Sequence, residues 1–237
     1  RRGSPGADDC PPTRERTVTG VSERALGGPA DELHPNVRDR YSLGPDDGAT
    51  VGRGRMDISR GTHVLPALYG MTARNMLFPE AGHDVRFAVT TEGYVLDGHE
   101  AMTTRRTFNF DGTRRRFDTV TVWDDRNDRL LDYLGTGGLV ATELHPRVES
   151  GRLVVEAGRQ WLHRGGRYLP LPDTMAADVA VRDRYDEADD RYHVVATVEN
   201  ALAGHVLSYR GAFTQAADVD VTETLRPLER LPKLPPR

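Results

Sequence analysis

The sequence predicts a mainly β protein: a strongly curved antiparallel sheet or closed barrel, lipocalin-like in shape, with one or two short helices. Segments that alternate apolar and polar residues follow one another from residue 85 to residue 214. Turn residues such as Asp97-Gly98 and Asp111-Gly112 separate these segments. The spacers are too short for the crossover helices that parallel strands need, so neighbouring strands pair as hairpins. A sheet of about ten such strands curls, and closing it removes its exposed edges.

The two ends of the chain differ in composition from the middle. Residues 1–30 are rich in Gly, Pro, Arg and Asp and show no period, which predicts a disordered or loosely attached tail. Residues 31–215 carry the apolar pattern and form one expected β-rich domain. Residues 216–237 form an expected extended tail, since four prolines among the last thirteen residues exclude a helix interior or a central strand.

Two segments before the alternating region have helical features. Asp31 caps an expected turn that runs to Tyr41, and Pro35 restricts where it begins. Between residues 65 and 77 apolar side chains recur at helical spacing, with Pro66 at a first helical position and Pro79 as the stop. We expect this second helix to cover an end or a gap of the barrel.

Each expected strand has two faces of different polarity. One face should pack inside while the other meets water, as in many antiparallel sheets. The strands are expected at residues 85–89, in a run that ends at Phe108 and Phe110, and at 116–123, 129–134, 139–144, 152–157, 159–164, 178–186, 191–200 and 205–214.

Composition excludes several classes of protein. The formal net charge of −4 argues against a general nucleic-acid binder. No apolar run reaches the length of a membrane span, and the single cysteine excludes an intrachain disulfide. No arginine-led apolar segment follows Arg1, so we expect no secretory signal and a cytoplasmic location. The sequence carries no signal for an oligomeric state.

The motifs of common catalytic and cofactor sites are incomplete. Gly135 and Gly137 resemble the opening of a dinucleotide loop, but Val140 stands where a third glycine belongs, which favours a glycine-rich bend between strands. His99-Glu100 lacks a histidine at position 103, and there is no cysteine pair. No serine stands in a Gly-x-Ser-x-Gly turn, and no phosphate loop is present. We expect neither a metal nor a cofactor.

Several motifs are similar in order and spacing to those of a bacterial family of domains of unknown function, family 4166. The similarity extends from about residue 33 to residue 215, and it implies kinship without supplying catalytic residues. Some members of the family look like domains fused to redox or epimerase-like partners, which implies a link to metabolism. The motifs are Met76–Val85, Arg106–Phe108, Arg116–Asp118, Asp132–Thr136, Val181–Asp186 and Ser208–Thr214.

Arg106 is the most informative charged residue. Strand alternation places it on the same face as Phe108, and therefore inside the barrel. A buried arginine needs carboxylate partners, and Glu80, Asp118 and Asp132 are the candidates. One interpretation is an anion or carboxylate clamp inside the barrel. The other is structural: an internal ion pair that fixes the register, or a solvated edge.

The candidate ligand-binding residues are Glu80, Arg106, Tyr133, Trp161 and Tyr209. The aromatic residues could line a cavity and present a hydroxyl or indole donor, or could be ordinary core. Glu80 follows Pro79 in a loop, where it could act as an acid or base or cap a turn. Catalytic residues stay unassigned.

Three functions remain open. The first is a module that binds a small, mostly apolar ligand inside the barrel. The second is a cofactor-independent enzyme, of isomerase or cyclase type, that uses the same cavity. The third is a structural or partner-binding domain with a filled core.

Overall fold

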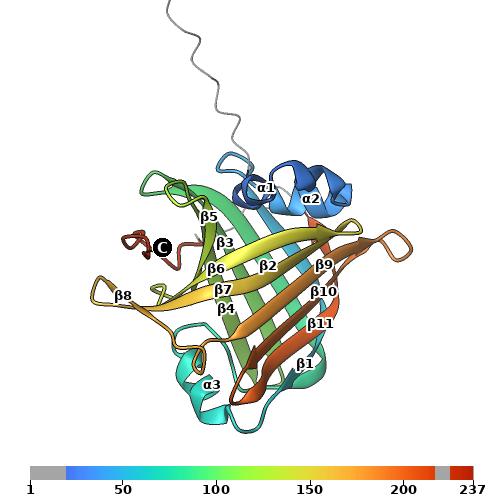
Figure 1. The fold of residues 1–237 in the computed structure, drawn as a ribbon. Helices are drawn as coiled ribbons and strands as arrows, with labels where there is room; N and C mark the ends of the chain where they lie inside the picture. The colour runs from blue at the N-terminus through green and yellow to red at the C-terminus, as the bar shows by residue number, and fades with distance from the viewer. Residues whose placement is uncertain (1–19, 217–224, 237) are drawn as a thin grey trace, which may run out of the picture.

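Ten antiparallel strands close into a barrel in the computed structural model, which describes residues 20–216 and 225–236 (Figure 1). The first and last strands pair with each other, and a second contact between β7 and β9 completes the ring. A short eleventh strand, β8, is attached to the far half of β7. The strands are β1 (Ala49–Arg60), β2 (Gly82–Leu96), β3 (His99–Phe110), β4 (Thr113–Asp124), β5 (Arg129–Leu134), β6 (Val140–Glu149), β7 (Arg152–Arg164), β8 (Arg167–Pro170), β9 (Asp178–Asp186), β10 (Arg191–Asn200) and β11 (Gly204–Ala216).

Short helices close both ends of the barrel. At one end lie α1 (Val21–Leu26), the 3-10 helix η1 (Gly28–Glu32) and α2 (Pro35–Tyr41), and at the other end lies α3 (Leu65–Thr72) (Figure 1). The Leu68 side chain of α3 is fully buried among the residues of the barrel core. The expectation of a mainly β, closed antiparallel fold with few short helices is confirmed.

The strand register shows which side chains face inward. Directly opposed residues of neighbouring strands point to the same face of a sheet. Phe87 of β2 is opposite Phe108 of β3, and both belong to a cluster that includes Val194 and Leu207 from the opposite wall. These residues therefore face inward, and Arg106, two positions from Phe108, does so as well.

The residues from Leu225 to Pro236 lie against the outer face of the barrel. Leu228, Leu231 and Leu234 contact an outward-facing apolar cluster on β2 to β7. The backbone N–H of Gly137 donates to the carbonyl oxygen of Pro227 at 3.0 Å. We call Leu225–Pro236 the C-terminal strap. Because it covers this surface, parts of β4 and β5 are buried on both faces, unlike the expected water-facing outer side.

The first strand was absent from the sequence-based prediction. Gly52 and Gly54 weaken the strand pattern of β1, because glycine has no side chain to pack. Gly52 faces inward at a close approach: a Cβ atom there would lie 2.7 Å from Val89 Cγ1 and 2.8 Å from Phe213 Cδ2. The neighbouring side chains therefore occupy the space that a larger residue at position 52 would need.

Other boundaries also differ from expectation. Residues 20–30, expected in a loose tail, form α1 and most of η1, and Val21 is buried against the barrel. The helix expected over residues 65–77 ends at Thr72, and Asn75 adopts a left-handed backbone with φ of 50°. Residues 1–19 and 217–224 of the two expected tails lie outside the described residues.

Candidate functional site: the barrel interior

Four threonines form a continuous row across the inner wall. Thr50, Thr91, Thr104 and Thr119 are opposed in register on β1, β2, β3 and β4. All four are buried, and they are small for a barrel of this width. We call this row the threonine belt. It lies between the aromatic core near α3 and the helices α1 and α2 at the other end.

An acidic residue lies beside the belt. Asp132 of β5 is opposite Thr121 of β4, whose hydroxyl donates to Asp132 Oδ1 at 2.9 Å. Burial raises the pKa of Asp132 to about 6, against the opposing effects of Thr121, Arg106 and Thr119. The carboxyl group is therefore poised to change protonation close to neutral pH.

Arg106 faces the same interior and forms only weak contacts. Its guanidinium carbon lies 5.0 Å from the ring centre of Phe117, and Nη1 is 3.5 Å from Thr119 Oγ1, a long hydrogen bond. Within the described ranges no carboxylate oxygen lies within ion-pairing distance of Arg106. The inward cation thus lacks the direct carboxylate partner that the sequence analysis expected.

Two of the three expected partners are engaged elsewhere. Glu80 binds Arg115 through two hydrogen bonds of 2.8 and 2.6 Å. Asp118 faces outward and forms ion pairs with Arg105 at 3.4 Å and with Arg116 at 2.6 Å. The third, Asp132, shares the interior with Arg106 and interacts with it electrostatically without direct contact.

A second polar group lies where α2 meets the barrel. Arg40 Nε is 3.2 Å from Asp183 Oδ2, and the Tyr41 hydroxyl donates to the same oxygen at 2.8 Å. Arg40 also donates to Gln215. Burial raises the pKa of Asp183, although Arg40 and Tyr41 oppose this shift. The other oxygen, Asp183 Oδ1, is buried and has no hydrogen-bond partner among the residues described.

Several inward-facing side chains keep accessible surface inside the closed wall. Arg106, Asp132 and Phe117 are only partly buried, although the register directs all three into the barrel. The buried hydroxyl of Thr50, on the belt, also lacks a hydrogen-bond partner in the described part of the chain. The inner wall therefore combines partly exposed side chains with unsatisfied polar groups.

The five candidate ligand-binding residues predicted from the sequence lie in three different parts of the fold. Arg106 and Tyr209 face inward, and the Tyr209 ring lies 5.4 Å from that of Phe108. Tyr133 and Trp161 face outward beneath the C-terminal strap, so they do not line the interior. Glu80 stays with Arg115, as described above. Strand alternation separates the two faces of β5 and β7, but both faces carry large apolar side chains, and the pattern alone does not say which is inside.

Arg40 and Asp183 are functional-site residues that were not predicted from the sequence. These residues are 143 positions apart and meet only because α2 closes the barrel end above β9. The threonine belt was also missed as a group, because its members come from four different strands. For Thr119 the sequence did carry a signal of its direction, because Thr119 and Thr121 alternate with Val120 and Val122.

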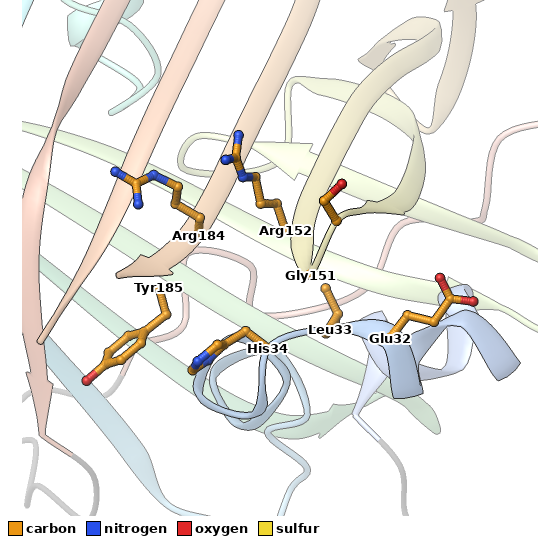
Figure 2. Close-up of a pocket in the computed structure, with 8 residues that line it drawn as sticks. Glu32, Leu33, His34, Gly151, Arg152, Arg184 and Tyr185 are labelled. Atoms are coloured by element: carbon orange, nitrogen blue, oxygen red, sulfur yellow. The ribbon is translucent and has the colours of Figure 1, made fainter. Parts of the chain in front are cut away.

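A separate pocket of about 300 Å³ opens on the surface between the η1–α2 junction, the β6–β7 turn and the end of β9 (Figure 2). The His34 and Tyr185 rings stack at 4.9 Å. Arg184 is paired with Asp186 at 2.5 Å, and His34 Nδ1 accepts from the backbone of Asn36 at 3.2 Å. These contacts engage His34, Tyr185 and Arg184, three of the polar side chains that line the pocket. The pocket is lined by Glu32, Leu33, His34, Ser150, Gly151, Arg152, Arg184 and Tyr185.

One cluster has the composition of a metal site. Asp186, Asp189 and His193 offer ligand atoms within 4.8 Å of one another. Arg184 already binds Asp186, however, and His193 Nε2 lies 2.8 Å from Asp189. The cluster lies near the surface and its charges are paired within the protein, so these contacts provide a structural explanation for it.

Fold and site together define a closed antiparallel β-barrel, capped by helices, with a polar belt inside. The chain belongs to the family described as Domain of unknown function (DUF4166), whose model matches residues 33–213. It is similar to the uncharacterized protein YndH of Bacillus subtilis (strain 168), with 30% identity over 190 residues, which cover 77% of this chain and 91% of that protein. The family resemblance found in the sequence is thus confirmed.

Two further comparisons concern structure. No solved structure matches this chain significantly. Among the described residues, no helix has the length and apolar character needed to cross a membrane.

Proposed function

We propose that the barrel interior binds one small, mostly apolar molecule. The observation that carries this proposal is the partial exposure of Arg106, Asp132 and Phe117 inside a closed wall. Eight-stranded barrels are just wide enough to be filled by side chains or to hold one small ligand, and a ten-stranded barrel is wider. The threonine side chains of the belt are small, so they do not fill the extra width of a ten-stranded barrel.

The apolar character of the ligand follows from the surrounding side chains. Val89 is directly opposite Arg106 on the inner wall, and Phe117 lies beneath its guanidinium. A few polar groups among apolar walls are typical of small-molecule sites. Helices at both ends would shield such a ligand from water.

A neutral, environment-sensitive dye tests this proposal. Nile red should bind the purified protein at about one molecule per chain and increase in fluorescence. Native mass spectrometry should also show a retained small molecule on protein purified from its host. Absence of both would overturn the proposal and favour a structural domain with a filled core.

A matched pair of variants locates the bound dye. Thr104→Phe adds a ring on the inner face of β3, where unfilled space would accept it, so the protein should fold and lose dye binding. Thr107→Phe adds the same ring on the outer face of β3 and should retain binding. If the interior is already filled, Thr104→Phe should instead destabilise the fold by about 1–3 kcal/mol.

One observation favours an enzyme as the second candidate. An interior carboxyl group with a pKa of about 6, as at Asp132, suits proton transfer near neutral pH. An isomerase or cyclase that works by acid–base catalysis would need only this carboxyl group and an interior of suitable shape. A molecule that stays bound to the wild-type protein should then be converted on incubation, which changes its mass spectrum or its chromatographic elution. Asp132→Asn should still bind the molecule but should not convert it.

A further inference from the structure

We infer that the interior ligand carries an acid group, of the carboxylate class, and that Arg106 holds it. This inference rests on the proposed function and adds the chemical class of the ligand. A guanidinium presents five N–H donors in a planar fork that matches a carboxylate. The described contacts of Arg106 use only one of these donors, in the 3.5 Å contact with Thr119. The fork therefore has donors left for a ligand.

The strand order explains why Asp132 does not occupy this position. Arg106 is on β3 and Asp132 on β5, with β4 between them. Strands lie about 4.8 Å apart, and the register also offsets the two residues by four positions along β4, so their backbones are roughly 16 Å apart. The Arg106 side chain reaches over β4, where Phe117 and Thr119 support its guanidinium. The two charges influence each other across this distance without forming a direct pair.

The other interior charges each have a closer polar partner than Arg106 has. Arg40 and Tyr41 both bind Asp183 Oδ2. Thr121 donates to Asp132. Arg106 is thus an inward cation of the described strands without a direct carboxylate contact, whereas Arg60, at the end of β1, donates to the carbonyl oxygen of Pro79. A bound acid would supply the missing partner, and the apolar remainder of the molecule would contact Val89 and Phe117.

Acid binding should depend on pH. Asp132 faces Arg106 from β5, and Asp183, with Arg40 and Tyr41, faces it from β9 and α2. When Asp132 loses its proton above its pKa of about 6, its charge both attracts Arg106 and repels a bound carboxylate. The affinity for an acid should therefore increase about 3- to 10-fold as the pH falls from 8 to 5.5.

The test compares acids with alcohols of the same skeleton. The probes are octanoic acid with octanol, and cinnamic acid with cinnamyl alcohol, each titrated into the full chain by calorimetry or Nile red displacement. The wild-type protein should bind each acid more tightly than its alcohol. Arg106→Gln should weaken acid binding about 10- to 100-fold and leave alcohol binding nearly unchanged. Arg86→Gln removes an exposed cation from the outer face of β2 and should change neither.

A second variant keeps the inference testable if Arg106→Gln fails to fold. Asp132→Asn should strengthen acid binding at pH 8 and remove most of its pH dependence. Equal affinities for acids and alcohols, or tighter binding of the alcohols, would overturn the inference while leaving the proposed function in place. If no acid binds but Nile red does, the inference fails alone. If none of the probes and no dye bind, both fail.

Discussion

Two aspartates on neighbouring strands show how the face of a strand determines what a charged residue does. Asp118 is on the outer face of β4 and forms ion pairs with Arg105 and Arg116. Asp132 is on the inner face of β5, where a threonine hydroxyl at 2.9 Å is its close hydrogen-bond donor. The first residue joins neighbouring strands, whereas the second carries a charge whose burial is poorly compensated. Such a residue reduces stability when ionised and is retained more readily where it serves a site.

Replacing Asp132 with Asn should stabilise the protein at neutral pH. The pKa is about 6 in the folded state against about 3.9 in the unfolded chain, so the folded carboxyl group holds its proton longer. The stability that it contributes is greatest below about pH 4 and is lost as the pH rises to 6. Asp132→Asn should therefore match the wild type near pH 4 and exceed it by about 2 kcal/mol at pH 7.5, a value reduced for partial exposure.

Urea denaturation at a series of pH values measures this difference. Asp111→Asn, at an exposed turn, serves as the control because it removes the same charge away from the interior. A difference between wild type and Asp132→Asn that stays constant from pH 4 to 7.5 would contradict the assigned burial of the charge.

At the scale of elements, the C-terminal strap is held by specific contacts as well as by apolar packing. Arg129 is buried and donates to the carbonyl oxygens of Pro235 and Pro236, the latter at 3.3 Å. Arg226 lies 3.7 Å above the ring of Tyr94 and pairs with Glu92 at 2.8 Å. Prolines lack an N–H donor, so an extended strap offers its carbonyls to the barrel without leaving donors unsatisfied.

Leu228 should be the main apolar anchor of the strap. Its side chain is 3% exposed and packs on the outer cluster that contains Tyr133 and Trp161. Leu228→Ala should reduce the free energy of unfolding by about 2–3 kcal/mol, the usual cost of removing a buried leucine side chain. Lys233→Ala changes an exposed strap residue and should have an effect within about 0.5 kcal/mol. Equal stability of the two variants in chemical denaturation would show that the strap does not support the barrel.

At the scale of the whole molecule, the sequence was sufficient for the class of fold and the inward direction of Arg106. Both depend on the two-residue period of strands and on short turns, which are local properties. The Arg40–Asp183 contact was beyond reach because it depends on closure across 143 positions. The outward direction of Tyr133 was missed because the strap covers the outer face of β5, so that large apolar side chains are buried on both faces. Local patterns therefore predict elements well, whereas contacts between distant elements depend on how the ring closes.

Ring closure itself can be tested at the contact between β7 and β9, where the register runs from Leu153 opposite Asp183 to Glu156 opposite Ala180. Opposed residues of antiparallel strands have Cα atoms close enough for a disulfide. With Cys10 replaced by serine, Glu156→Cys and Ala180→Cys should crosslink under mild oxidation. The crosslink closes a loop of about 25 residues and should stabilise the fold by about 3 kcal/mol, which raises Tm by roughly 5–10 °C over the reduced form.

Glu156→Cys with Arg184→Cys places the thiols about 13 Å apart along the strands and should not crosslink. Failure of the first pair to form, or equal formation of both, would mean that the barrel is open between β7 and β9.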